Sequence, residues 1–131
     1  MKVLFVCTEN ACRSVMAEAL ANHFFGPRVR AFSAGTKPKG VHPLTREVLA
    51  ELGLETEGLR SKSLEEFAGE EFDLVVTLCE PARSCPVVPQ AKRKLHLSLP
   101  DPARAGEISA FREVRDEILA HLQELLKKEE Q

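Results

Sequence analysis

A short apolar strand followed at once by a polar loop and a helix constrains the fold of this chain more than any other feature. The run KVLFV at residues 2–6 is continuously apolar, which is typical of a parallel strand covered on both faces. After the loop CTENACRS, apolar residues recur at helical spacing as far as the expected stop at Gly26-Pro27: Val15, Met16, Ala19, Leu20 and Phe24. A strand, a tight loop and a helix in this order indicate the first unit of an α/β fold.

The alternation of strands and helices continues to the end of the chain. Further strands are expected at residues 29–34, 73–78 and 94–97. Three patterns predict helices: Leu44, Val48 and Leu52 ahead of Gly53; a capping box of Ser63 and Glu66; and a C-terminal face of Phe111, Val114, Ile118, Leu122 and Leu125. The order predicts one domain over residues 1–131, a three-layer sandwich in which helices flank a central four-stranded parallel sheet.

Charge and hydropathy exclude several classes of protein. The net charge is −2, whereas nucleic-acid and membrane surfaces need clustered Lys and Arg. No run approaches the roughly 18 apolar residues of a membrane span, and the run before Cys7 is too short for a signal-peptide core. We therefore expect a cytoplasmic protein, and we expect a monomer because no pattern suggests an obligate interface. In that reducing compartment, four cysteines indicate catalysis, redox chemistry or metal binding rather than a disulfide framework.

The loop at residues 7–14 has the composition of a site for a tetrahedral oxyanion. Successive backbone N–H groups and a helix N-terminus favour negative charge, so six residues are expected to bind the anion: Glu9, Asn10, Ala11, Cys12, Arg13 and Ser14. The same field stabilises a thiolate at Cys7, which makes this sulfur a candidate nucleophile near neutral pH. Arg13 offers a planar fork for bidentate contact, and Ser14 can donate a hydrogen bond to the thiolate.

The pattern C-x5-R-S near the start of a small α/β chain resembles the low-molecular-weight tyrosine phosphatase family. The resemblance extends along nearly the whole chain, and Asp101-Pro102 after the fourth expected strand matches the family's late Asp-Pro. It implies that Asp101 is the general acid. The family holds hydrolases, which work with Cys7, Arg13 and this acid, and a branch of thiol-dependent arsenate reductases, which need further cysteines.

The stretch TLCEPARSCP at residues 77–86 resembles the loop of the thioredoxin-coupled arsenate reductases, which carry a cysteine pair there. Three other segments match as well: FSAG at 32–35, LVVTLC at 74–79 and RDEI at 115–118. The resemblance implies that Cys79 attacks Cys7, and that Cys85 then attacks Cys79 to leave a disulfide for thioredoxin to reduce. We therefore interpret the chain as a single catalytic domain that reduces arsenate to arsenite, with thioredoxin as reductant and no tightly bound cofactor.

Several positions depart from the reductase pattern. Five residues separate Cys79 from Cys85, where the reductases usually have six, and Glu9 stands where their loop commonly has glycine. Two alternatives stay open. One is a phosphatase that hydrolyses phosphotyrosine or aryl phosphates through a phosphocysteine at Cys7, although the chain has no tyrosine or tryptophan for an aromatic substrate. The other is a module that only senses oxyanions or redox state. Cys12 is either a packing residue or, as the resemblance to the phosphatases implies, a disulfide partner of Cys7.

No metal site is predicted. Some members of the family bind potassium near the loop through an Asn, a Glu, a Ser and an Asp. The first three are matched here, but the fourth place holds another serine: Asn10, Glu18, Ser33 and Ser63. A zinc site built from Cys79, Cys85 and His96 would lack a fourth ligand, and its C-x5-C spacing exceeds the usual range.

Overall fold

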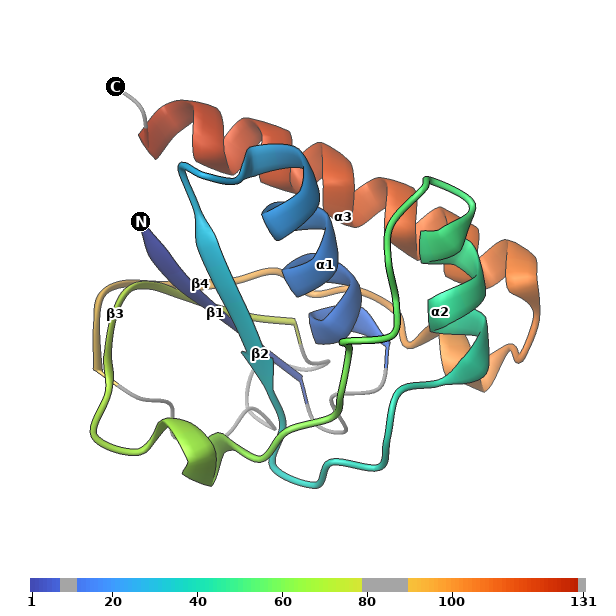
Figure 1. Cartoon of the computed structure of the whole chain (residues 1–131), viewed down its shortest axis with the longest axis horizontal. Coiled ribbons are helices and arrows are strands. Elements are labelled where there is room, and N and C mark those ends of the chain that lie inside the picture. The colour runs from blue at the N-terminus through green and yellow to red at the C-terminus, as the bar shows by residue number, and fades with distance from the viewer. Residues whose placement is uncertain (8–11, 79–89, 130–131) are drawn as a thin grey trace.

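Four parallel strands form one sheet at the centre of the molecule. A computed structural model describes residues 1–7, 12–78 and 90–129. The strands are β1 (Lys2–Val6), β2 (Arg30–Ala34), β3 (Glu71–Thr77) and β4 (Gln90–His96), and they lie in the order β2-β1-β3-β4 (Figure 1). Phe5 pairs with Ser33 on one side and with Val76 on the other, so β1 is central. Because the strands are parallel, their carboxyl ends meet at a single edge.

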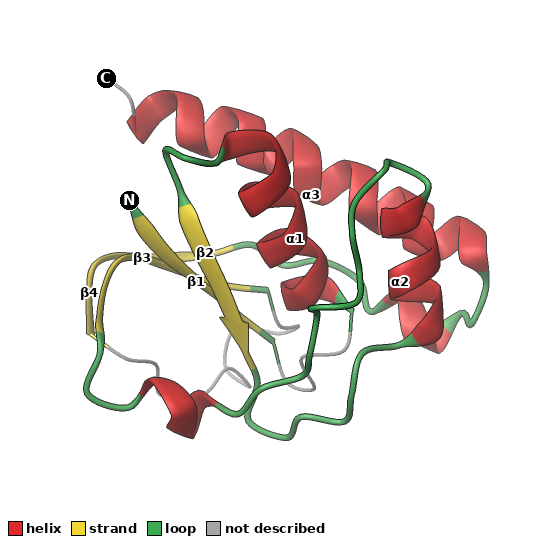
Figure 2. Ribbon diagram, in the orientation of Figure 1, coloured by secondary structure: helices red, strands yellow, loops and turns green. Residues whose placement is uncertain are grey.

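Helices flank this sheet unequally. The longer ones are α1 (Arg13–Phe25), α2 (Pro43–Ala50) and α3 (Ile108–Glu129), and the one-turn 3-10 helices are η1 (Leu64–Phe67) and η3 (Pro102–Arg104). Figure 2 shows α1, α2 and α3 gathered on one side of the sheet and η1 on the other. The predicted architecture, a four-stranded parallel sheet flanked by helices, is confirmed.

Each face of the sheet has its own apolar core. Alternate residues of a strand point to opposite faces, so Val3 and Phe5 join the core beneath the long helices, while Leu4 and Val6 join the core beneath η1. The second core is smaller and is built around three phenylalanines that meet edge to face: Phe32, Phe67 and Phe72. The continuous apolar character of β1 therefore has its expected cause, burial on both sides.

The ends of some elements differ from the sequence-based expectation. β4 begins at Gln90 rather than at residue 94. The first half of the strand is rich in charged residues, so it lacks the apolar pattern by which a strand is predicted from the sequence. β4 is also the outer strand of the sheet, where charged side chains are commonly found. The expected helix at Ser63 is the short 3-10 turn η1, and Ser63 Oγ accepts from Glu65 N rather than from Glu66 N as a capping box requires.

The buried faces of the helices also differ at single positions. In α1 the expected Phe24 is exposed, and the small residues Ala17 and Ala21 are buried instead. In α2 the buried face carries Leu49 beside Val48, and in α3 Leu126 is more deeply buried than Leu125. Glycine at 53 has φ 84°, two residues beyond the helix C-cap, and so supplies the expected stop of α2.

A charged cluster holds α2 on α3. Arg112 and Arg115 of α3 both bind Glu51 at the C-cap of α2, at 2.6 Å and 2.8 Å. Arg115 also donates to the carbonyl of Val48. These bonds hold α2 against α3. No helix in the described part of the chain is long and apolar enough to cross a membrane.

Candidate active site

Cys7 lies immediately after β1, at the carboxyl edge of the sheet. Its backbone N–H donates to Ala34 O of β2 at 3.2 Å, and its side chain is buried. The sulfur lies 2.9 Å from Ser14 Oγ, which is completely buried in the first turn of α1. A hydroxyl at this distance can donate to a thiolate and stabilise it. The structure therefore brings together the nucleophile and the hydroxyl that the sequence predicts.

Arg13 is the first residue of α1, and the residue is only 8% exposed. Its Nη1 donates to two backbone carbonyls, Leu78 O after β3 and Leu99 O after β4, at 3.2 Å and 3.0 Å. A guanidinium has further N–H groups in the same plane, which can reach a bound oxyanion. The two carbonyl bonds orient this plane, and they tie the ends of two strands to the start of the helix. The acceptors could not have been predicted from the sequence.

Cys12 is a buried thiol at the N-cap of α1. Burial raises the pKa of Cys12 to about 12, although a hydrogen bond with Thr45 of α2 acts in the opposite direction. The charges of Asp101 and Cys7 raise this pKa by smaller amounts, and the charge of Arg13 lowers it. A thiol with so high a pKa is protonated near neutral pH and is a poor nucleophile. This supports the interpretation of Cys12 as a packing residue.

Asp101 follows β4 and caps η3. Its Oδ1 accepts from Ala103 N at 3.0 Å, so the side chain stabilises the turn at the start of η3. Asp101 lies beyond the carboxyl end of β4, two residues after Leu99, whose carbonyl binds Arg13, so it is at the same edge of the sheet as Cys7. The aspartate is therefore a turn former at a position from which it could also act on a ligand of the loop.

The place suggested by the family's potassium ligands holds a lysine. Glu18 Oε1 accepts from Ser33 Oγ at 2.7 Å and from Lys62 Nζ at 3.0 Å. An ammonium group on this carboxylate supplies the positive charge that an alkali ion would bring, so the predicted ligands that the structure describes do not fit such an ion. Sequence reasoning missed Lys62, because only the fold brings it to Glu18. Elsewhere in the described residues, no cluster of three or more His, Cys, Asp or Glu could hold a metal.

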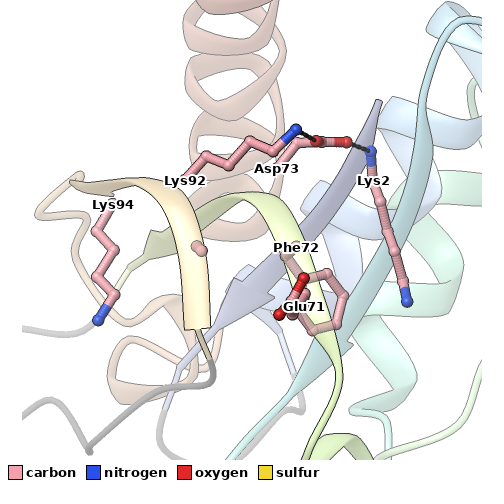
Figure 3. Close-up of a pocket in the computed structure, with 7 residues that line it drawn as sticks. Lys2, Glu71, Phe72, Asp73, Lys92 and Lys94 are labelled. Carbon is pink, nitrogen blue, oxygen red and sulfur yellow. Dashed lines mark hydrogen bonds and ion pairs between the residues drawn. The ribbon is translucent and has the colours of Figure 1, made fainter.

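A pocket of about 630 Å³ lies away from this edge, at the amino ends of β1, β3 and β4. Figure 3 shows Asp73 between the backbone of Lys2 and the side chain of Lys92, with Phe72 and Glu71 nearby. Two of its charged side chains, Asp73 and Lys92, form an ion pair at the surface. None of the predicted site residues that the structure describes lines the pocket, so its size does not make it a candidate for the chemistry.

The remaining predicted site residues lie outside the described part of the chain: Glu9, Asn10, Ala11, Cys79 and Cys85. The residues that are described form a consistent set. A thiol, a hydroxyl and an anchored arginine converge at a helix N-terminus, where negative charge is favoured. Such a set is suited to hold a tetrahedral oxyanion against a cysteine sulfur.

The chain belongs to the low molecular weight phosphotyrosine protein phosphatase family, whose model matches residues 2–131. Arsenate reductase 2 of Staphylococcus epidermidis is 37% identical over 117 residues, which is 88% of each chain. A solved arsenate reductase in the phosphate-binding state is 29% identical with a TM-score of 0.85, covering 97% of both chains. A thioredoxin-dependent arsenate reductase of Corynebacterium glutamicum is 33% identical with a TM-score of 0.77, covering 97% of this chain and 60% of that one.

Proposed function

We propose that this protein is an arsenate reductase that takes electrons from thioredoxin. The observation that carries the proposal is the buried Cys7 sulfur beside Ser14 and Arg13, in a chain whose relatives are arsenate reductases over most of their length. The choice of thioredoxin as reductant is supported by the similarity to the thioredoxin-dependent arsenate reductase of Corynebacterium glutamicum. Two further cysteines, Cys79 and Cys85, supply the additional thiols that arsenate reduction needs.

The first step joins arsenate to the nucleophile. Arsenate binds in the loop of residues 7–14, where backbone N–H groups and Arg13 hold its oxygens. The Cys7 thiolate attacks arsenic and displaces one oxygen, which leaves as water after Asp101 protonates it. Arsenic keeps its oxidation state in this step, because an oxygen ligand is merely exchanged for sulfur. Ser14 stabilises the thiolate before attack and again when the sulfur is released.

The second step reduces arsenic. The Cys79 thiolate attacks the Cys7 sulfur, the S–As electron pair passes to arsenic, and arsenite leaves as the Cys7–Cys79 disulfide forms. Cys85 then attacks Cys79, which frees Cys7 and moves the disulfide to Cys79–Cys85. Thioredoxin returns two electrons and two protons to this pair. Each arsenate therefore consumes one dithiol, and one water is released.

A phosphatase is the second candidate function, because the family model describes phosphotyrosine phosphatases. The same Cys7, Arg13 and Asp101 could form and hydrolyse a phosphocysteine. The chain carries Ala103 after Asp101-Pro102 and has no tyrosine or tryptophan to grip an aromatic substrate. Phosphate hydrolysis is therefore proposed only as a side activity.

The use of thioredoxin as reductant bears on where the enzyme works. We propose that it works in the cytoplasm, where thioredoxin and glutathione systems keep thiols reduced. We also propose that residues 1–131 act as a single catalytic domain and as a monomer, since every residue in the two steps belongs to one chain.

The experiment that tests the proposal measures arsenate-dependent NADPH oxidation with thioredoxin and its reductase, beside hydrolysis of an aryl phosphate. Wild type should turn over repeatedly. Cys85→Ser should release about one arsenite per enzyme and then stop, because the Cys7–Cys79 disulfide cannot be passed on. Ser84→Ala, a change at the neighbouring position, should leave turnover intact. Aryl-phosphate hydrolysis without arsenite production would instead establish the phosphatase.

A further inference from the structure

Lys62 is one of the few charged residues that the fold buries. It is 8% exposed, and its ammonium group lies 3.0 Å from Glu18 Oε1. The same oxygen accepts from Ser33 Oγ at 2.7 Å, and Lys62 Nζ also donates to Arg60 O at 3.1 Å. The ammonium group is therefore a cationic centre bound by a carboxylate and a carbonyl, and the Ser33 hydroxyl donates to the same carboxylate oxygen.

This centre lies close to the nucleophile in the fold. Ser33 pairs with Phe5 of β1, and the next residue of β2, Ala34, accepts the backbone N–H of Cys7. The segment that carries Lys62 is bound to the same strand end, because Gly35 N donates to Lys62 O at 2.9 Å. The cationic centre is thus one strand away from the sulfur.

Glu18 connects the centre to the oxyanion loop through α1. The helix begins at Arg13 and Ser14, and Glu18 follows one turn later on the same rigid element. The carboxylate is drawn to β2 by both Ser33 and Lys62, so these contacts fix the helix against the sheet. A shift of α1 would move Arg13 and Ser14 together relative to the Cys7 sulfur.

A carboxylate held by a hydroxyl in a buried place needs a positive charge, because a buried, unpaired charge is very costly. Oxygen ligands of this kind also suit a hard cation. An ammonium group and a potassium ion carry the same charge and are similar in size, so either could serve. In this chain the positive charge belongs to the Lys62 side chain, so it does not depend on the concentration of ions in solution.

We propose that Lys62 is a built-in cation that positions the first turn of α1 for oxyanion binding, and that it makes this protein indifferent to the identity of the alkali ion in solution. Lys62 touches neither oxyanion nor sulfur; it is a positioning residue that acts through Glu18. The inference concerns the oxyanion loop, and it rests on the proposed function only where arsenate turnover is the readout.

The test replaces the internal cation and asks whether an external one can substitute for it. Wild type and Lys62→Ala are assayed for arsenate turnover in NaCl and in KCl at constant ionic strength. Wild type should differ less than twofold between the salts. Lys62→Ala should lose about tenfold in kcat/KM in NaCl, since a small displacement of positioned groups has effects of this order. Potassium or ammonium should restore most of this loss along a saturable curve.

Lys2→Ala is the matched control, because Lys2 also binds a glutamate, Glu70, at 2.8 Å but at the opposite end of the sheet. It should show no preference between the salts. Lys62→Gln is a second variant that keeps a donor for Glu18 without the charge. It should lose activity as Lys62→Ala does, and it keeps the test available if the alanine variant does not fold.

Two readouts do not need arsenate chemistry. Potassium should raise the melting temperature of Lys62→Ala more than sodium does, with little difference for wild type. Inorganic phosphate should protect Cys7 from iodoacetamide about tenfold less well in Lys62→Ala in sodium, for the same positional reason. If arsenate is not turned over at all, the proposed function fails while these two measurements still decide the role of Lys62.

Three results would overturn the inference. Wild type could respond to potassium as strongly as Lys62→Ala does. Lys62→Ala could keep its kcat/KM and its phosphate protection while losing only thermal stability, which would make the ion pair merely structural. Alternatively, the losses in Lys62→Ala could resist both potassium and ammonium.

Discussion

Two lysine–glutamate pairs of nearly equal length lie at opposite ends of one sheet, and their surroundings differ. At the amino end, Lys2 binds Glu70 at 2.8 Å with side chains 36% and 42% exposed. At the carboxyl end, Lys62 binds Glu18 at 3.0 Å with side chains 10% and 14% exposed. Exposed pairs are screened by water and contribute little, whereas breaking a buried pair leaves an uncompensated charge. Distance alone therefore does not rank the two pairs; burial does.

The same contrast holds for the other polar residues at the two ends. The carboxyl end buries an arginine, two serines and a lysine: Arg13, Ser14, Ser33 and Lys62. The amino end keeps its charges on the surface, where Lys92 approaches Asp73 at 3.4 Å (Figure 3). Burying polar groups is costly unless each finds a partner. In this chain these buried polar groups lie at the carboxyl end of the sheet, where Cys7 is next to the N-terminus of α1. Oxyanion chemistry needs donors held in fixed positions at such a site.

The strongest test of this contrast compares two buried arginines. Arg13→Lys should lower arsenate turnover about 100- to 1,000-fold, because an ammonium group cannot reproduce the planar fork that faces the oxyanion. Arg115 is equally buried, at 8% exposure, and also donates to a backbone carbonyl. Arg115→Lys should therefore reduce the melting temperature and leave the turnover of the folded protein unchanged. Steady-state kinetics and thermal unfolding of both variants would check this, and equal losses of activity would contradict it.

A smaller effect is expected from the hydroxyl beside the nucleophile. Ser14→Ala should slow the alkylation of Cys7 by iodoacetamide at pH 7 about tenfold, because the thiolate loses a hydrogen bond in a buried place. Ser63→Ala provides the control, since the Ser63 hydroxyl caps η1 and binds Glu65 N at 3.2 Å. That variant should change stability without changing the alkylation rate. An unchanged rate in Ser14→Ala would remove Ser14 from the proposed mechanism.

The sequence allowed the carboxyl-end site to be predicted where the signal was local. A strand, a loop and a helix within the first 25 residues placed Cys7, Arg13 and Ser14 at one edge. The apolar runs predicted the central strands for the same reason, because burial on both faces leaves a continuous pattern. These features depend on neighbours in the chain, and the structure confirms them.

Features that depend on distant segments could not be predicted in this way. Lys62 meets Glu18 across 44 residues, and no local pattern marks it as buried. Arg13 binds carbonyls of Leu78 and Leu99, which any residue type could have supplied. The helical spacing of Phe24 predicts a core position, but small residues on α1 pack there instead. In each case tertiary packing, rather than the local pattern, decides the outcome.

Replacing Glu51, which joins α2 to α3, is expected to lower the stability of the protein without changing its activity. Hydrogen bonds from Arg112 and then Arg115 lower the pKa of Glu51 to about 2. The stability it contributes is present above its ordinary pKa of 4.5 and is lost as the pH falls toward 2. Glu51→Gln should thus lower the melting temperature by about 3 °C at pH 7, with the difference shrinking below pH 4.5 and vanishing near pH 2. Glu113→Gln, an exposed position on α3, should not show this pH-dependent loss, and arsenate turnover should stay unchanged in both variants.

The smallest effect is expected at the amino end itself, at Asp73. The backbone N–H of Lys2 donates to its carboxylate at 2.7 Å, and this bond, with help from Lys92, lowers the pKa of Asp73 below its ordinary 3.8. Asp73→Asn keeps an oxygen to accept that N–H, so only the charge is lost, and at a surface position the charge is screened. The melting temperature should fall by about 1 °C at pH 7, and the difference should disappear as the pH drops below 3.8, where the wild-type carboxylate takes up a proton. Arsenate turnover and its response to salt should match those of wild type. A loss of turnover comparable to that of Lys62→Ala would instead mean that the two ends of the sheet are functionally coupled, and that the difference in burial does not make the ion pairs differ in function.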